Sequence, residues 1–85
     1  MGFLLYSRSG CCLCEEMLAE LRELPAAHGI PLEVADVDRD PATRARYGHK
    51  VPVLLFGGEL VCHGRLDVEE VLKALTCYRG PGRPV

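Results

Sequence analysis

A cysteine pair, Cys11-x-x-Cys14, stands between two segments with different hydrophobic patterns. Residues 3 to 7 before it form an apolar run, which is typical of a strand buried on both faces. After it, apolar residues recur three or four positions apart: Leu13, Met17, Leu21 and Leu24. That spacing predicts a helix from residue 12 to residue 24. Arg8, Ser9 and Gly10 form the turn between the predicted strand and the predicted helix. The cysteine pair therefore lies at a strand-to-helix junction.

The segment that follows makes this junction part of a larger unit. Residues 32 to 37 alternate in part between apolar and polar side chains, which predicts a second strand. A helix between two strands forms a βαβ unit, whose strands are parallel and whose crossover is right-handed. The sequence therefore predicts an α/β domain built around a parallel strand pair.

The rest of the chain adds a helix, a hairpin and a last helix. Asp40 as N-cap and Pro41 at the first helical position begin a short helix that ends at Gly48. Residues 51 to 56 and 59 to 63 form two strands, and the Gly57-Gly58 turn between them predicts an antiparallel hairpin. Asp67 caps the last helix, with Glu70 placed for a capping box. The predicted order is β-α-β-α-β-β-α.

Length and charge limit the classes of function. A chain of 85 residues forms one domain, which we assign to residues 1–78, with a flexible tail at 79–85. A net charge of −2 without a basic face disfavours nucleic-acid binding. No run reaches the roughly 18 apolar residues of a membrane span. We expect a monomer that binds neither nucleic acid nor membrane.

The cysteine count points to a reducing compartment. There are five cysteines, and we expect no signal peptide because the first residues lack a basic segment followed by a long apolar core. An odd number of cysteines without an export signal indicates free thiols and a cytoplasmic location rather than a disulfide framework. We expect Cys62 and Cys77 to be core residues.

The position of the cysteine pair predicts its chemistry. The first N–H groups of a helix have no intrahelical partner, and the helix dipole adds partial positive charge there. Both effects favour a thiolate over a thiol, as helix N-termini and Cys-x-x-Cys pairs do in general. Cys11 would lie at that helix end. Cys14, one turn later on the same side, lies close enough to form a disulfide with it.

Together, the order of elements, the Cys11-x-x-Cys14 pair and the Val51-Pro52 dipeptide resemble the thioredoxin superfamily. The stretch Cys11-Cys12-Leu13-Cys14-Glu15 is similar to the Cys-x-Leu-Cys-Glu site of short bacterial glutaredoxin-like proteins. The resemblance implies a thioredoxin-like fold with a four-stranded mixed sheet in the order 4-3-1-2 and helices on both faces.

The same resemblance implies roles for individual residues. Cys11 would be the nucleophile and Cys14 the resolving thiol of a thiol–disulfide oxidoreductase. Pro52 would be cis and would place the Val51 backbone against a bound substrate. Arg8 stands where glutaredoxins often carry lysine, so its cation would favour the thiolate and meet a substrate carboxylate.

Two departures from the glutaredoxin pattern concern substrate binding and proton transfer. In glutaredoxins, a Gly-Gly pair followed by acidic residues binds glutathione, and the stretch from His63 to Asp67 matches this segment. Asp67 would be the acidic residue that contacts the substrate. Arg65 replaces one of the two glycines. Thioredoxins have a buried aspartate where this chain has Leu5. Disulfide-containing proteins or glutathione are the expected partners. Glutathione or a reductase system would regenerate the dithiol, and no cofactor would be tightly bound.

Other interpretations remain open on the sequence alone. Cys12 is a tolerated exposed residue, a second nucleophile or a site of intermolecular bridging. Three cysteines in four positions also suggest a metal or iron–sulfur site. Zinc sites usually show a second close ligand pair, for which Cys62 and His63 are the nearest candidates. These two residues are adjacent and point to opposite faces of a strand, so they cannot readily both bind one metal ion. We therefore expect no metal. The competing class is a non-catalytic thioredoxin-fold module that binds proteins or carries a cluster.

Overall fold

The computed structural model describes residues 2–79, with the side chains of residues 2–76, and its elements follow the predicted order. The strands and helices are β1 (Phe3–Ser7), α1 (Cys12–Glu23), β2 (Leu32–Asp36), α2 (Pro41–Tyr47), β3 (Val53–Phe56), β4 (Glu59–His63) and α3 (Val68–Arg79). Two short 3-10 turns, η1 (Pro25–Ala27) and η2 (Val37–Arg39), complete the connections.

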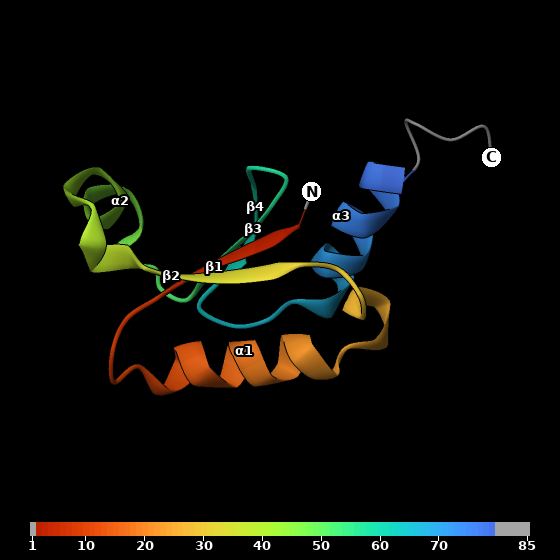
Figure 1. The fold of residues 1–85 in the computed structure, drawn as a ribbon, viewed down its shortest axis with the longest axis horizontal. Coiled ribbons are helices and arrows are strands. Elements are labelled where there is room, and N and C mark those ends of the chain that lie inside the picture. The colour runs from red at the N-terminus through yellow and green to blue at the C-terminus, as the bar shows by residue number, and fades with distance from the viewer. Residues whose placement is uncertain (1, 80–85) are drawn as a thin grey trace.

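The four strands form one mixed sheet in the order β2-β1-β3-β4 (Figure 1). β1 and β2 are parallel, as the βαβ unit requires, and β3 is antiparallel to both β1 and β4. Gly57 and Gly58 form the hairpin turn with φ of 61° and 86°, a region that glycine enters without steric cost. The predicted sheet order 4-3-1-2 is confirmed.

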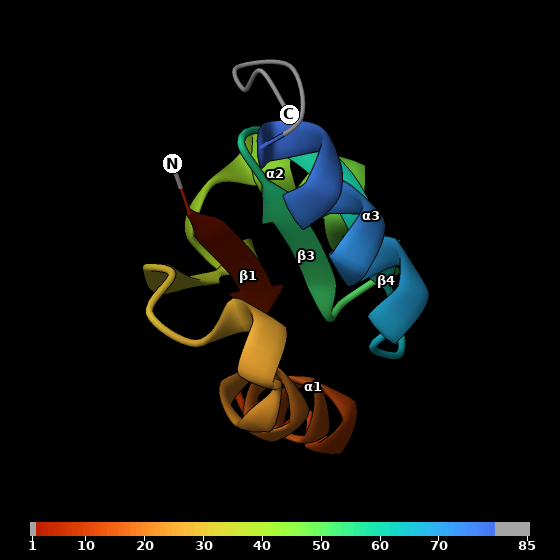
Figure 2. The same ribbon diagram turned by 90° about the vertical axis from the view of Figure 1, so that its right-hand side faces the viewer.

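Helices cover both faces of the sheet because side chains alternate along β1. Phe3 and Leu5 are buried in the core that α1 and α3 cover (Figure 2). Tyr6 points to the opposite face and stacks on Tyr47 of α2, with ring centroids 5.4 Å apart. The thioredoxin-like arrangement of layers is therefore present.

A single apolar cluster joins the sheet to α1 and α3. Leu5, Met17 and Leu54 are essentially inaccessible to solvent, and Leu5 pairs with Leu54 in the β1–β3 register. The buried members of this cluster are Phe3, Leu5, Met17, Leu21, Ala27, Leu54, Phe56, Val71 and Leu75. The helical spacing in the sequence matches the buried face of α1 at Met17 and Leu21, whereas Leu13, the first residue of that spacing, is exposed and Cys14 is buried in its place.

Some predicted boundaries were wrong by one or two residues. β3 begins at Val53 rather than at Val51, because Pro52 has no N–H for a sheet ladder, and its carbonyl instead accepts a hydrogen bond from Gly64 N at 2.8 Å. β2 ends at Asp36 rather than at Val37, which is buried as the first residue of η2. α1 ends at Glu23, and Leu24 is its C-cap.

The last helix begins as predicted. Asp67 Oδ1 accepts a hydrogen bond from Glu70 N at 3.3 Å, whereas the Glu70 carboxylate is paired with Lys73 at 3.5 Å. α3 includes Arg79, the first residue of the predicted tail, and residues 80–85 of that tail lie outside the described residues. Within residues 2–79, none of the helices has the length and apolar character that crossing a lipid bilayer requires.

Candidate active site

The sheet register brings the candidate site segments to one edge of the sheet. β1 and β2 are parallel and end opposite each other at Ser7 and Asp36. β3 runs the other way, so its first residue, Val53, pairs with Tyr6 near that same edge, and β4 ends there at His63. The connections at this edge are residues 8–11, 37–40, 48–52 and 64–67. All the sequence-predicted site residues except Cys14 lie in these four connections. Cys14 lies in the first turn of α1, directly after the connection formed by residues 8–11.

Cys11 is the N-cap of α1. Its backbone is extended, with φ of −94° and ψ of 109°, and its Sγ accepts a hydrogen bond from Cys14 N at 3.2 Å. The turn before it is closed by Cys11 N, which donates to Arg8 O at 3.2 Å, and Gly10 takes φ of 76° there. The sulfur therefore occupies the position of an N-cap side chain, where an unpaired helix N–H meets it.

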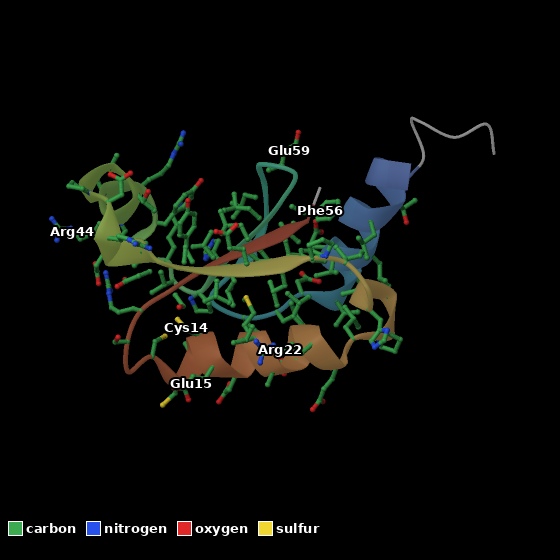
Figure 3. All side chains as sticks on the ribbon, in the orientation of Figure 1. Cys14, Glu15, Arg22, Arg44, Phe56 and Glu59 are labelled. Atoms are coloured by element: carbon green, nitrogen blue, oxygen red, sulfur yellow. The ribbon has the colours of Figure 1, made fainter. Side chains whose placement is uncertain are left out.

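Cys14 is the buried partner of Cys11. Its side chain is 3% exposed, and Figure 3 shows it between α1 and the sheet. Burial raises the pKa of the Cys14 thiol to about 11, and its hydrogen bond to the Cys11 sulfur acts in the same direction. The Arg8 backbone N–H and cation oppose this rise in pKa. The resting pair thus has a half-buried sulfur at the helix end and a protonated thiol behind it.

A surface groove reaches Cys14 from the side of β2. It has a volume of about 470 Å³, and Cys14 lines it together with Arg8, Glu15 and Asp36. The described residues include no buried polar or charged side chain, so no carboxylate lies beside the thiol in the core. The groove therefore brings the otherwise buried Cys14 to the protein surface.

The raised pKa of Cys14 predicts a loss of stability in alkali. A folded-state pKa of about 11, above the ordinary cysteine value of about 8.5, gives stability that is complete below pH 8.5 and is lost as pH rises towards 11. Urea unfolding of the reduced protein should therefore show a loss of about 2 kcal/mol between about pH 7.5 and about pH 10.5 that the Cys14→Ala variant lacks.

The control for this experiment is Cys62→Ala. Burial also raises the pKa of the Cys62 thiol, so this variant removes a different titrating sulfur while Cys14 remains. The Cys62→Ala protein should keep the pH dependence that is due to Cys14. Identical pH dependence in wild type and Cys14→Ala would contradict the assignment.

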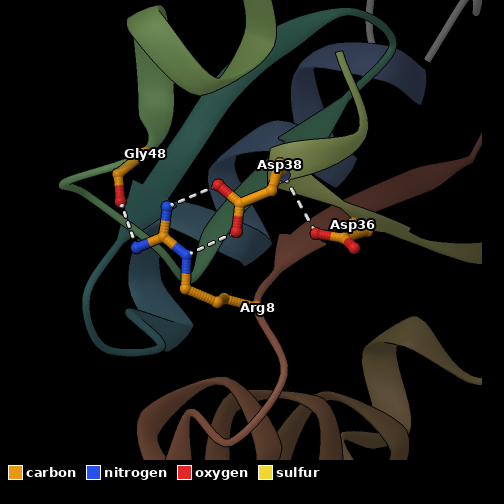
Figure 4. Close-up of polar contacts among 4 residues, drawn as sticks. All are labelled: Arg8, Asp36, Asp38 and Gly48. Carbon is orange, nitrogen blue, oxygen red and sulfur yellow. Dashed lines mark hydrogen bonds and ion pairs between the residues drawn. The ribbon is translucent and has the colours of Figure 1, made fainter. Parts of the chain in front are cut away.

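Arg8 is held by partners within the protein. Its Nε and Nη2 donate to the two carboxylate oxygens of Asp38, both at 2.8 Å, and its Nη1 donates to Gly48 O at 3.0 Å (Figure 4). The predicted contact of Arg8 with a substrate carboxylate stays a prediction. The pairing lowers the pKa of Asp38, and the Arg8 cation remains near enough to Cys11 to interact with it electrostatically.

The remaining predicted substrate contacts lie in two neighbouring connections. The Val51–Pro52 peptide bond is cis, as the resemblance implies, and Pro52 is buried while Val51 is half-buried. The hydrogen bond from Gly64 N to Pro52 O ties this segment to the turn before α3. Asp67 is exposed and lines a second groove with Cys62 and Arg65. Substrate binding by Val51, Pro52 and Asp67 stays a prediction.

The other cysteines occupy different environments. Cys12 is exposed, whereas Cys62 is half-buried and packs against the core cluster. The side chain of Cys77 lies outside the described residues. In the part of the chain whose side chains are described, no three histidine, cysteine, aspartate or glutamate residues are grouped in a way that would hold a metal ion.

The sequence reasoning did not find Asp38 or Gly48 as partners of Arg8. A signal existed, because Arg8 directly follows β1 and Asp38 follows the parallel neighbour β2 after one intervening residue. Parallel strands place their carboxyl ends at one edge, which brings such residues together. Gly48 contributes only a backbone carbonyl, which side-chain chemistry could not have indicated.

The fold and the dithiol turn define a thioredoxin-superfamily protein of the glutaredoxin-like kind. The chain belongs to the family described as Glutaredoxin-like domain (DUF836), whose model matches residues 3–76. Among curated proteins, it is 32% identical over 71 residues to the uncharacterized protein Rv0508 of Mycobacterium tuberculosis, covering 78% of this chain and 71% of the relative.

Solved structures support the same classification. Protein Ne2328 from Nitrosomonas europaea matches with a TM-score of 0.75 and 35% identity, over 85% of this chain and 87% of that one. Protein XcR50 from X. campestris matches with a TM-score of 0.67 and 26% identity, over 89% and 97% of the two chains. Thioredoxin 1 from Thermosipho africanus shares the fold, with a TM-score of 0.60 and 22% identity over 92% and 93%.

Proposed function

We propose that this protein is a thiol–disulfide oxidoreductase that acts by dithiol exchange through Cys11 and Cys14. The observation that carries the proposal is the hydrogen bond from Cys14 N to the Cys11 sulfur at the start of a 12-residue helix. An N–H donor and the helix dipole stabilise negative charge on that sulfur. A thiolate there is the attacking species in disulfide exchange.

The exchange has two steps. The Cys11 thiolate attacks one sulfur of a substrate disulfide, which forms a mixed disulfide and releases the other substrate sulfur as a thiolate. Cys14 then loses its proton to solvent in the groove and attacks the Cys11 sulfur, which releases the second substrate thiol. The substrate gains two electrons, and the protein is left with a Cys11–Cys14 disulfide.

The return of the protein to the dithiol requires an external reductant. Glutathione and a NADPH-dependent reductase are the two candidate donors, and disulfide-bearing proteins or glutathione disulfide are the candidate substrates. The odd number of cysteines favours free thiols, which suits the cytoplasm as the compartment of this activity.

A turnover assay tests the proposal and identifies the donor. Each donor, glutathione with its reductase or thioredoxin reductase, is supplied alone with a protein disulfide, and NADPH consumption is followed. Consumption that requires the protein with at least one donor is expected, and the Cys11→Ser/Cys14→Ser double variant should be inactive with both donors. The opposite outcome has two parts: the wild type is inactive with both donors, and its reduced form does not form a Cys11–Cys14 disulfide with oxidised glutathione. That outcome would favour the non-catalytic module instead.

A further inference from the structure

The guanidinium of Arg8 links parts of the chain that are far apart in sequence. Its partner Asp38 is 30 residues away, and its other partner, Gly48 O, is 40 residues away. Figure 4 shows the planar guanidinium between these groups, with the Asp38 carboxylate bound on two nitrogens. Asp38 is itself held, because its N–H donates to Asp36 Oδ1 at 2.9 Å. The fork geometry fixes direction as well as distance.

The linked segments are those that frame the cysteine pair. The carbonyl of Arg8 accepts a hydrogen bond from Cys11 N at 3.2 Å, so Arg8 is part of the turn that sets the Cys11 backbone. Gly48 is the C-cap of α2 and lies three residues before Val51. The side chain of Arg8 thus connects the cysteine turn to the connection that carries the cis-proline.

The charge of Arg8 is largely cancelled where it lies. Asp38 is 2.8 Å away, and Asp36 adds further negative charge nearby, while Arg44 is the other cation that acts on Asp38. A neutralised guanidinium contributes less to a thiolate than a free cation would. The structure therefore favours a geometric effect of Arg8 on Cys11 over an electrostatic one.

We propose that Arg8 is a positioning residue, whose paired contacts with Asp38 and Gly48 hold the Cys11 turn against the Pro52 connection. The inference rests on the proposed dithiol function and adds a determinant of Cys11 reactivity. It also gives Asp38 a role, as the partner that orients the guanidinium.

Three substitutions separate geometry from charge. If Arg8 positions the turn, Arg8→Lys should slow alkylation of Cys11 by iodoacetamide about tenfold, as should Arg8→Ala, because lysine cannot form the fork. Asp38→Asn should also be slower. If charge alone matters, Arg8→Lys should match wild type and Asp38→Asn should react faster, because it leaves a free cation beside Cys11. All measurements use a Cys12→Ser background and a range of pH values.

Controls keep the result specific. Arg22→Lys makes the same exchange in the last turn of α1, away from the Cys11 end of that helix, and should leave alkylation unchanged. Exposed ion pairs contribute little to stability, so the Arg8 variants should fold, and thermal unfolding checks this. Wild-type alkylation in Arg8→Lys, or faster alkylation in Asp38→Asn, would overturn the proposal.

The two proposals fail in different ways. Alkylation reports on Cys11 whether or not the protein turns over a substrate, so the positioning role is tested independently of activity. If wild type forms no Cys11–Cys14 disulfide with oxidised glutathione, the oxidoreductase proposal fails whatever the Arg8 variants show. If wild type is active and the Arg8→Lys variant reacts and turns over like it, only the positioning role fails.

Discussion

Replacing Cys11 with serine is expected to abolish disulfide reduction, with a loss of rate of at least about 1,000-fold. A serine hydroxyl does not ionise at neutral pH, so the N–H of Cys14 would have no anion to stabilise. The measurement is the rate at which the reduced protein consumes a peptide disulfide under single-turnover conditions. Rates near that of the wild type in Cys11→Ser would contradict the assignment of the nucleophile.

The Cys14→Ser variant should fail at a different step. Cys11 would still attack the substrate, but no second thiol would release it, so the mixed disulfide should accumulate and show the substrate mass in an intact-mass measurement. Cys12→Ser is the matched control, because Cys12 lies between the two on the same helix and is exposed. The Cys12→Ser variant should keep the wild-type rate and trap no substrate. In the Cys14→Ser variant, a substrate bound to Cys12 instead of Cys11 would make Cys12 the nucleophile.

Most of the fold follows from patterns within short stretches of sequence. The βαβ unit could be predicted because an apolar run, a helical spacing and a second strand follow one another without ambiguity. The hairpin depended on Gly57 and Gly58, which both take positive φ. The strand boundary at Val51-Pro52 could not be predicted from its apolar pattern, because hydrogen-bond pairing, not side-chain character, decides where a strand begins.

In the candidate site too, the residues close in sequence could be predicted and the contacts between distant segments could not. Cys11 and Cys14 are three residues apart, so local helix geometry places them together, and the sequence was sufficient to predict this. Arg8 and Asp38 meet only through the pairing of β1 with β2, and the sequence alone does not show which charged residues will pair across such a distance. The sequence was therefore sufficient to locate the dithiol. It predicted that Arg8 contacts a substrate carboxylate, but it did not indicate that Asp38 is the partner of Arg8.

The core that supports this site predicts a second large effect, on stability. Leu54 lies in β3, is inaccessible to solvent and pairs with Leu5 at the centre of the apolar cluster. Leu54→Ala should lower the free energy of unfolding by about 3 to 5 kcal/mol, because it removes buried methyl groups and leaves a cavity. A domain of this size has about 5 to 10 kcal/mol in total, so the midpoint of thermal unfolding should fall by at least about 15 °C.

Leu72→Ala is the matched control, because the same side chain is removed from an exposed position. Leu72 lies on α3 and is 42% exposed, and alanine favours a helix, so its unfolding free energy should change by less than about 1 kcal/mol. Urea unfolding of both variants measures the difference. Equal losses would contradict the placement of Leu54 in the core. A large loss confined to Leu54→Ala is expected instead, because β3 lies between β1 and β4 and its buried side chains join the sheet to the helices.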